Sequence, residues 1–403
     1  MGQKTPAHEA HMDFPQRFSN LPEYAFPRLR SLLDHHPAGG DVVHMTIGEP
    51  KHPMPSFVSE ILTQHVHEFA KYPPNDGAPE LLAAIAAWVG KRYGVNVDAE
   101  KQILTLNGTR EGLFNAGLSL CPENKSGKKC NILIPNPFYQ VYAVSTAAAG
   151  ANPVFVPALA ENEYLPDYTS LPTSVLDDTA ICFICSPSNP QGAIASADYW
   201  RDLIGLAEKH DFKIFADECY SEIYRDTPPV GALEMADKLG ADPERVVIFH
   251  SLSKRSNLPG LRSGFAAGGP KTIAEMKRLR AYAGAPLPLP LQRVATAAWQ
   301  DEKHVQENRA LYVKKYDVAD QIFATTPNYK KPSAGFFLWL PVDDGETAAL
   351  KLWQETGVRV LPGAYLSRKV SGPDAGTGYI RVAMVAPIDE MQNGLHAIKD
   401  CLY

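Results

Sequence analysis

The chain has 403 residues, which is more than one hydrophobic core usually serves, so two domains or one large layered unit are expected. Apolar residues make up 45% and charged residues 21% of the chain, with a formal net charge of -6. This weakly acidic balance gives no electrostatic reason to expect nucleic acid or a membrane as a partner, and no apolar run approaches the roughly 18 residues of a membrane span.

The first residues of the chain bear on its cellular compartment, and its cysteines bear on disulfide and metal chemistry. Residues 1–12 are polar and lack the apolar centre of a signal peptide, so we expect a cytoplasmic protein with a disordered first segment. The six cysteines do not suggest a disulfide framework. Cys182 and Cys185 form a C-x-x-C, but in the apolar strand that surrounds them they would point to opposite faces. We therefore expect buried, inert thiols and no metal site, while Cys219 is the thiol expected near a functional site.

Helix and strand patterns alternate along the chain. Helices are predicted at residues 80–93, 111–120 and 200–210, and strands at residues 103–106, 132–134, 153–156, 180–185, 213–216 and 246–249. Strands separated by helices at this spacing imply an α/β fold with a mostly parallel sheet covered on both faces. Ligands of such sheets bind outside the carboxyl ends of the strands.

Lys254 is the clearest candidate for chemistry. It lies in the run Ser251-Leu252-Ser253-Lys254 after the last predicted strand, with Arg262 further along. We expect it on a polar turn at the end of a buried strand, desolvated enough to lose its proton, beside hydroxyls and a guanidinium that can hold a phosphate. A lysine that forms a Schiff base with pyridoxal 5'-phosphate (PLP) needs such neighbours, although a lysine near a serine is more often plain surface.

Further candidates fall at the carboxyl ends of predicted strands. Residues 108–110 lie between a strand and a helix, where free N–H groups can meet an anion, although a tight turn has the same pattern. Asp217 ends a buried strand and requires a cation, either a protonated pyridine nitrogen or an ordinary salt-bridge partner. Tyr220 and Asn189 could reach the phenolic oxygen of PLP, and Tyr139 could stack on its ring.

A series of motifs along nearly the whole chain resembles the fold-type I PLP-dependent aminotransferases of classes I and II. The motifs are TIGEP (46–50), YPPNDG (72–77), NGTR (107–110), PFY (137–139), NPQG (189–192), DECY (217–220), the segment 251–264 and YIRV (379–382). The resemblance implies an aspartate-aminotransferase-like three-layer α/β sandwich. A large PLP-binding domain would span residues 46–298, and a smaller α+β domain would combine residues 13–45 with 299–403.

The resemblance also implies a role for each matching residue. Lys254, Asp217 and Tyr220 would be catalytic: the lysine binds PLP and later moves a proton, and the aspartate keeps the pyridine nitrogen protonated. The cofactor-binding set comprises Tyr72, Gly108, Thr109, Arg110, Tyr139, Asn189, Ser251, Ser253 and Arg262, together with the catalytic residues. The substrate-binding set comprises Gly48, Asn189 and Arg381, and Arg381 would bind the α-carboxylate. Tyr72 would reach the cofactor phosphate of a neighbouring subunit, in a homodimer with shared active sites.

Longer stretches narrow the resemblance. Residues 24–33, 47–52, 135–142, 218–224 and 251–265 look like those of bacterial N-succinyldiaminopimelate aminotransferases. That family uses small amino and keto acids, exchanging amino groups between glutamate and N-succinyl-2-amino-6-oxopimelate by a ping-pong mechanism in diaminopimelate and lysine biosynthesis.

The natural amino acceptor is left open by the sequence. Residues 282–291 (YAGAPLPLPL) are rich in proline and depart from the pattern of that family. An aminotransferase of aspartate, aromatic or broad specificity, or a PLP-dependent C–S β-lyase, therefore stays an alternative. Arg28, Arg30 and Lys51 are candidates for binding a distal carboxylate, although each could equally be surface charge.

Overall fold

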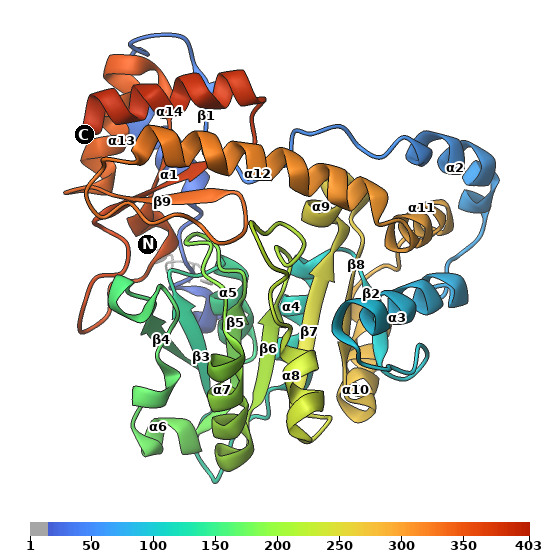
Figure 1. Ribbon diagram of the computed structural model, residues 1–403. Helices are drawn as coiled ribbons and strands as arrows, with labels where there is room; N and C mark the ends of the chain where they lie inside the picture. The colour runs from blue at the N-terminus through green and yellow to red at the C-terminus, as the bar shows by residue number, and fades with distance from the viewer. Residues whose placement is uncertain (1–14) are drawn as a thin grey trace, which may run out of the picture.

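The central element is a seven-stranded sheet with the strand order β2-β8-β7-β6-β5-β3-β4. The computed structural model describes residues 15–403, so the segment 1–12, for which disorder is predicted, lies outside the described residues (Figure 1). The strands are β2 (Ile103–Leu106), β3 (Asn131–Asn136), β4 (Asn152–Pro157), β5 (Thr179–Cys185), β6 (Lys213–Asp217), β7 (Val246–Ser251) and β8 (Gly264–Gly268). Only β8 runs antiparallel to its neighbours, so the prediction of a mostly parallel sheet is confirmed.

Helices cover both faces of this sheet and form two separate cores (Figure 1). One face carries α4 (Thr109–Leu120), α5 (Gln140–Ala148) and α10 (Pro270–Ala283), and the other carries α3 (Pro79–Tyr93), α7 (Ala197–His210), α8 (Ala232–Leu239) and α11 (Leu289–Gln300). Successive residues of β5 alternate between the cores, because Cys182 and Ile184 join one and Ile181 and Phe183 join the other. Cys182 and Cys185 are buried free thiols, as predicted.

A smaller layered unit lies beside the carboxyl ends of the central strands. It holds an antiparallel sheet of β9 (Phe337–Pro341), β12 (Tyr379–Ala383) and β11 (Leu361–Pro362), and a parallel pair of β1 (Val43–His44) and β10 (Val358–Arg359). Helices α12 (Lys303–Phe323), α13 (Gly345–Thr356) and α14 (Ile388–Leu402) surround its core. The pairing of β1 with β10 brings the two ends of the chain together, while the predicted domain boundaries at 45/46 and 298/299 stay a prediction.

The remaining elements are short. They are α1 (Ala25–Leu33), α2 (Phe57–His65), α6 (Thr173–Asp177), α9 (Leu252–Arg255) and the 3-10 helices Gln16–Phe18, Val66–Ala70, Ala160–Asn162, Tyr168–Ser170, Pro259–Leu261 and Gly363–Leu366. Among residues 15–403, no helix is both long and apolar enough to cross a bilayer.

The edge formed by the carboxyl ends of β5, β6 and β7 collects the predicted catalytic residues. Asp217 ends β6, and it pairs across the sheet with Cys185 of β5 and with Phe249 of β7. β7 ends at Ser251, whose Oγ accepts a hydrogen bond from the backbone N–H of Ser253 at 3.0 Å. This cap starts α9, so Lys254 lies on a single helical turn rather than on the predicted polar turn.

Candidate active site

A cavity of about 470 Å³ lies at this edge of the sheet, between the central strands and the smaller unit. Its walls include the start of α1, the loop around Gly48, and residues of β9 and β12. The predicted site residues that line it are Gly48, Thr109, Arg110, Tyr139, Asn189, Asp217, Tyr220, Ser251, Ser253, Lys254, Arg262 and Arg381. Gly108 lies directly behind this wall, and Tyr72 does not reach it. Cys219 lines the cavity, as expected.

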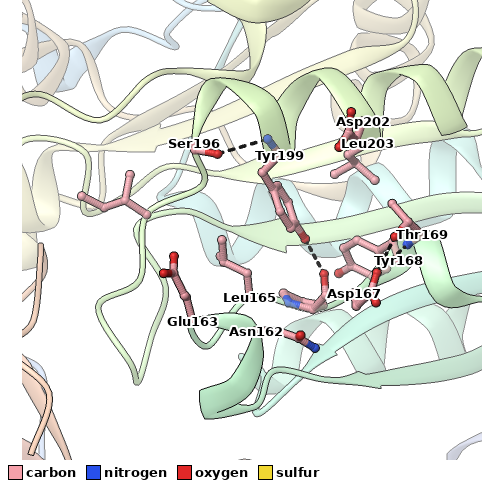
Figure 2. A pocket seen from close by; sticks show the side chains of 12 residues that line it. Asn162, Glu163, Leu165, Asp167, Tyr168, Thr169, Ser196, Tyr199, Asp202 and Leu203 are labelled. Atoms are coloured by element: carbon pink, nitrogen blue, oxygen red, sulfur yellow. Dashed lines mark hydrogen bonds between the residues drawn. The ribbon is translucent and has the colours of Figure 1, made fainter.

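A second hollow lies elsewhere on the central unit and contains no predicted site residue. It has a volume of about 260 Å³ and lies between residues 162–169 and α7 (Figure 2). Its polar groups serve local turns: Asp167 accepts from the backbone N–H of Thr169 at 3.0 Å, and the Tyr199 hydroxyl donates to the Pro166 carbonyl at 2.7 Å. The predicted chemistry therefore gathers at the first cavity.

Lys254 is buried, and its pKa is lowered. Its Nζ donates a hydrogen bond to the Gly48 carbonyl and lies 5.4 Å from the ring centre of Phe336. Burial lowers the pKa of Lys254 from 10.5 to about 8, and the positive charge of Arg381 acts in the same direction. At this pKa roughly a tenth of the amine is neutral, and hence nucleophilic, at pH 7.

Asp217 is a fully desolvated carboxylate. Its Oδ2 accepts from the Tyr142 hydroxyl at 2.8 Å, and its Oδ1 accepts from the Cys219 backbone N–H at 3.3 Å. Burial raises the pKa of Asp217, although these hydrogen bonds oppose that shift. Within residues 15–403, no lysine or arginine forms an ion pair with it. A bound cation would offset the cost of burying this carboxylate in its ionised form.

Tyr142 was missed as a site residue by the sequence reasoning. It is fully buried on α5, and its ring stacks on Phe183 with centroids 4.7 Å apart. Its position three residues after Tyr139 was the available signal, since such a spacing puts both side chains on one face of a helix.

The amino-terminal end of α4 forms an anion cradle with Arg262. Gly108 has φ 80° and precedes the first turn of α4, whose N–H groups receive no side-chain cap from it. A Cβ on Gly108 would collide with the Arg262 guanidinium, so glycine allows that group to lie against the helix start. The guanidinium is held by the carbonyls of Pro259 and Asn107 at 2.8 and 3.1 Å. Free N–H groups, a positive helix end and a fixed guanidinium suit a phosphate.

Hydroxyl groups complete this cradle from the opposite side. Ser251 Oγ donates to Ser253 Oγ at 2.8 Å, and both residues line the cavity. The Thr109 hydroxyl lies 3.2 Å from the thiol of Cys219, which places it beside the Asp217 segment.

Aromatic groups define the space between the cradle and Asp217. Tyr139 caps α5, and its hydroxyl accepts from Arg110 Nε at 2.8 Å. Tyr220 is buried, and its ring meets Phe336 edge-on with centroids 5.3 Å apart. Burial raises the pKa of Tyr220 well above 10, so its hydroxyl keeps its proton and can donate to an oxygen anion.

Arg381 brings a buried guanidinium from β12 to the opposite wall. It donates to Asn189 Oδ1 at 3.1 Å and to the Thr46 carbonyl at 2.7 Å, and it lies 4.3 Å from the ring centre of Phe337. Burial lowers the pKa of Arg381 to about 10, which still leaves it charged at neutral pH. Its buried Nε has no hydrogen-bond partner among the described residues. This cation suits a carboxylate ligand.

The cations considered for a distal carboxylate do not line the cavity. Arg28 pairs with Glu346 at 2.8 Å and lies over the ring of Tyr365, Lys51 lies 3.9 Å from Glu390, and Arg30 is exposed. The surface-charge alternative is therefore the one that the structure favours for all of them.

Tyr72 and the proline-rich segment lie on the outside of the chain. Tyr72 is fully exposed before α3, and Tyr282 is 92% exposed at the end of α10. The segment itself is fixed, because Arg280 donates to the carbonyls of Gly284 and Ala285, each at 3.0 Å. Asn107, next to the anion cradle, also donates to the Ala285 carbonyl.

The cavity fits PLP on the groups described here. The cradle suits its phosphate, Asp217 lacks a cation that a protonated pyridine nitrogen supplies, and Lys254 is a depressed-pKa amine between them. Tyr139 borders the space for a flat ring.

Comparison with known proteins agrees with this fit. The family model "Aminotransferase class I and II" matches residues 40–398. The LL-diaminopimelate aminotransferase of Dehalococcoides mccartyi (strain 195) is 32% identical over 395 residues, covering 95% of this chain and 97% of that protein. The crystal structure of an aminotransferase from Neisseria meningitidis Z2491 has a TM-score of 0.92 and 38% identity, over 96% of this chain and 100% of that one.

A more distant solved structure shows the same fold. It is a probable N-succinyldiaminopimelate aminotransferase from Thermus thermophilus, with a TM-score of 0.81 and 24% identity over 94% of this chain and 98% of that one. The chain therefore belongs to the class I and II aminotransferases, a family of PLP-dependent enzymes.

Proposed function

We propose that this aminotransferase moves an amino group between glutamate and a keto acid of diaminopimelate biosynthesis, by a ping-pong mechanism. The observation that carries the proposal is the cavity that a depressed-pKa lysine, Lys254, lines together with the buried Asp217 and Arg381. N-succinyl-2-amino-6-oxopimelate is the acceptor that the sequence motifs favour. LL-diaminopimelate is the second candidate substrate, because curated relatives about 30% identical to the chain carry that name.

The residues divide the chemistry among themselves. Bound PLP supplies an electron sink, and the protein supplies orientation, charge and proton transfer. Asp217 would hold the protonated pyridine nitrogen, and Asn189 and Tyr220 would hold the phenolic oxygen. The amine of Lys254 would hold the cofactor's aldehyde carbon, and its Nζ would be the general base that takes the proton from the substrate α-carbon.

Arg381 would orient the substrate by binding its α-carboxylate. Hydrogen bonds to Asn189 Oδ1 and to the Thr46 carbonyl, at 3.1 and 2.7 Å, fix its guanidinium. Three of its five N–H groups stay available in a fixed geometry for an α-carboxylate. Gly48 borders the same wall, and a Cβ there would collide with the ring of Phe337, so the loop around it can pack closely only with glycine at this position.

We further propose a homodimer with shared active sites. Tyr72 and Tyr282 are the most exposed large apolar side chains of the described chain, and Val66 and Phe69, close to Tyr72 in the sequence, are also exposed. Aromatic side chains left this exposed are typical of a surface that another subunit covers. Tyr72 would then reach the phosphate cradle of the partner, which explains why it does not reach its own.

The substrate proposal predicts a selective amino-acceptor profile. The enzyme loaded with PLP is reacted with glutamate, and the aminated cofactor form is then offered N-succinyl-2-amino-6-oxopimelate, the keto acid derived from LL-diaminopimelate, oxaloacetate and phenylpyruvate. We expect N-succinyl-2-amino-6-oxopimelate or the keto acid derived from LL-diaminopimelate to restore the absorption spectrum of the PLP form fastest. Preference for oxaloacetate or phenylpyruvate would contradict the proposal, and release of ammonia and pyruvate from cystathionine without a keto acid would favour a C–S β-lyase.

The pKa of Lys254 predicts how cofactor capture depends on pH. Because its amine is neutral only above its pKa, the rate at which the cofactor-free protein gains the visible absorption of bound PLP should rise with pH through a midpoint of about 8. Stopped-flow absorbance measures this rate, and Lys254→Ala serves as the control that shows no such band. A midpoint near 10.5, the ordinary value for lysine, would show that the amine is not desolvated.

Replacing Asp217 by asparagine tests the charge at the end of β6. The amide keeps the shape of the side chain but cannot hold the pyridine nitrogen protonated, so we expect turnover to fall by roughly a hundredfold or more while PLP still binds. The matched control is Asp167→Asn in the second hollow, which should retain normal turnover. Near-normal rates in the Asp217→Asn enzyme would mean that another group carries this charge.

Mixing inactive variants tests the shared site. Each proposed site takes Lys254 from one subunit and Tyr72 from the other. In a hybrid of one Lys254→Ala subunit and one Tyr72→Ala subunit, both changes fall in the same site, and the other site carries neither. We expect subunit exchange to restore part of the activity that each parent lacks. Full activity of a monomer in sedimentation, or no recovery after exchange has been verified by mass spectrometry, would refute the shared site.

A further inference from the structure

The segment that carries Lys254 is fastened to the amino-terminal end of α12. Figure 1 shows α9 below that end of the long helix, whose other end packs in the smaller unit near α14. Each of the residues 255–257, directly after the lysine, has a side-chain contact to this region. The contacts are Arg255 to Glu302 at 2.5 Å, Ser256 to His304 at 2.8 Å and Asn257 to Asn308 at 3.0 Å.

Asn308 is the member of this set that touches the lysine residue itself. Its Nδ2 donates to the Lys254 carbonyl at 3.4 Å, and its side chain is buried. Its Oδ1 accepts from Asn257 Nδ2 and lies 2.8 Å from His52 Nδ1. Since Oδ1 can only accept, His52 must carry its hydrogen on Nδ1.

His52 connects this contact to the amine of the lysine. It follows Gly48 in the same loop, and the Gly48 carbonyl accepts from Lys254 Nζ. One buried amide therefore holds both the main chain of Lys254 and the loop on which the amine of Lys254 rests. The ring of His52 is itself fixed against Tyr312, with centroids 4.6 Å apart.

We propose that Asn308 is a positioning residue for Lys254, which it acts on through the main-chain carbonyl and through the Gly48 loop. This inference rests on the proposed role of Lys254 as the cofactor-binding and proton-carrying amine. Proton transfer depends steeply on geometry, and a misplacement of about 1 Å can reduce a rate roughly a hundredfold. Asn308 does not line the cavity, so we expect its effect to pass through Lys254 and the Gly48 loop.

The decisive variant is Asn308→Asp in the full-length enzyme loaded with PLP. It keeps the size of the side chain and an acceptor for His52 and Asn257, but it replaces the donor to the Lys254 carbonyl by an oxygen that repels it. We expect the single-turnover half-reaction with glutamate to slow by roughly tenfold or more, with a larger isotope effect for glutamate deuterated at Cα. We also expect faster amide hydrogen exchange in the peptide that spans residues 252–258.

A matched control separates positioning from general destabilisation. Asn131 also donates from Nδ2 to a main-chain carbonyl, that of Val175 at 3.2 Å, but it lies at the amino-terminal end of β3, away from the cavity. Asn131→Asp should lower the unfolding temperature and leave the half-reaction, its isotope effect and the exchange of 252–258 unchanged. Equal slowing in both variants, or no slowing in Asn308→Asp, would overturn the proposal.

A second variant tests the same contact if Asn308→Asp does not fold. His52→Phe keeps a ring against Tyr312 but removes the hydrogen bond to Asn308, so the same changes should appear in smaller measure. Wild-type rates and exchange in His52→Phe would then overturn the inference. Continued turnover by Lys254→Ala is a separate result, which would refute the proposed function itself rather than the role of Asn308.

Discussion

A buried carboxylate without a protein cation is the constraint around which this site is arranged. Asp217 ends a strand whose neighbours on both sides are buried, and desolvation raises its pKa. Tyr142 and the Cys219 backbone donate to its two oxygens, but these are neutral donors. A cationic ligand would offset the cost of ionising this carboxylate, and the proposed function assigns that part to the pyridine nitrogen of PLP.

Residues from both structural units form the site. The cradle at α4, Asp217 and Lys254 belong to the large sheet, whereas Arg381 comes from β12 and Gly48 from the loop before α2. Lys254 lies at the junction, because its amine contacts the Gly48 loop and its main chain contacts α12. The position of the reactive amine is therefore sensitive to the relative placement of both units.

Much of this arrangement was predictable from local patterns, and the exceptions have physical reasons. Apolar runs located the six predicted strands, but β8 was not recognised, because its residues other than Phe265 are glycine and alanine, which give little strand signal. The turn after β7 became a helix through the cap from Ser251. Arg28 could not be assigned from sequence, because its partner Glu346 lies on a helix 318 residues away. The role proposed for Tyr72 requires a second subunit, which the sequence of one chain does not place.

The most direct test of the account is to locate the amine that binds PLP. Among residues 15–403, burial lowers the pKa of two lysines to about 8. They are Lys254 in the cavity and Lys315 on α12, whose Nζ donates to the Val385 carbonyl at 3.2 Å. Reduction of the PLP-loaded protein with borohydride fixes the cofactor to its lysine, and peptide mass spectrometry identifies the residue. The account predicts the added mass on Lys254. Its appearance on Lys315, or on any other lysine in place of Lys254, would contradict it.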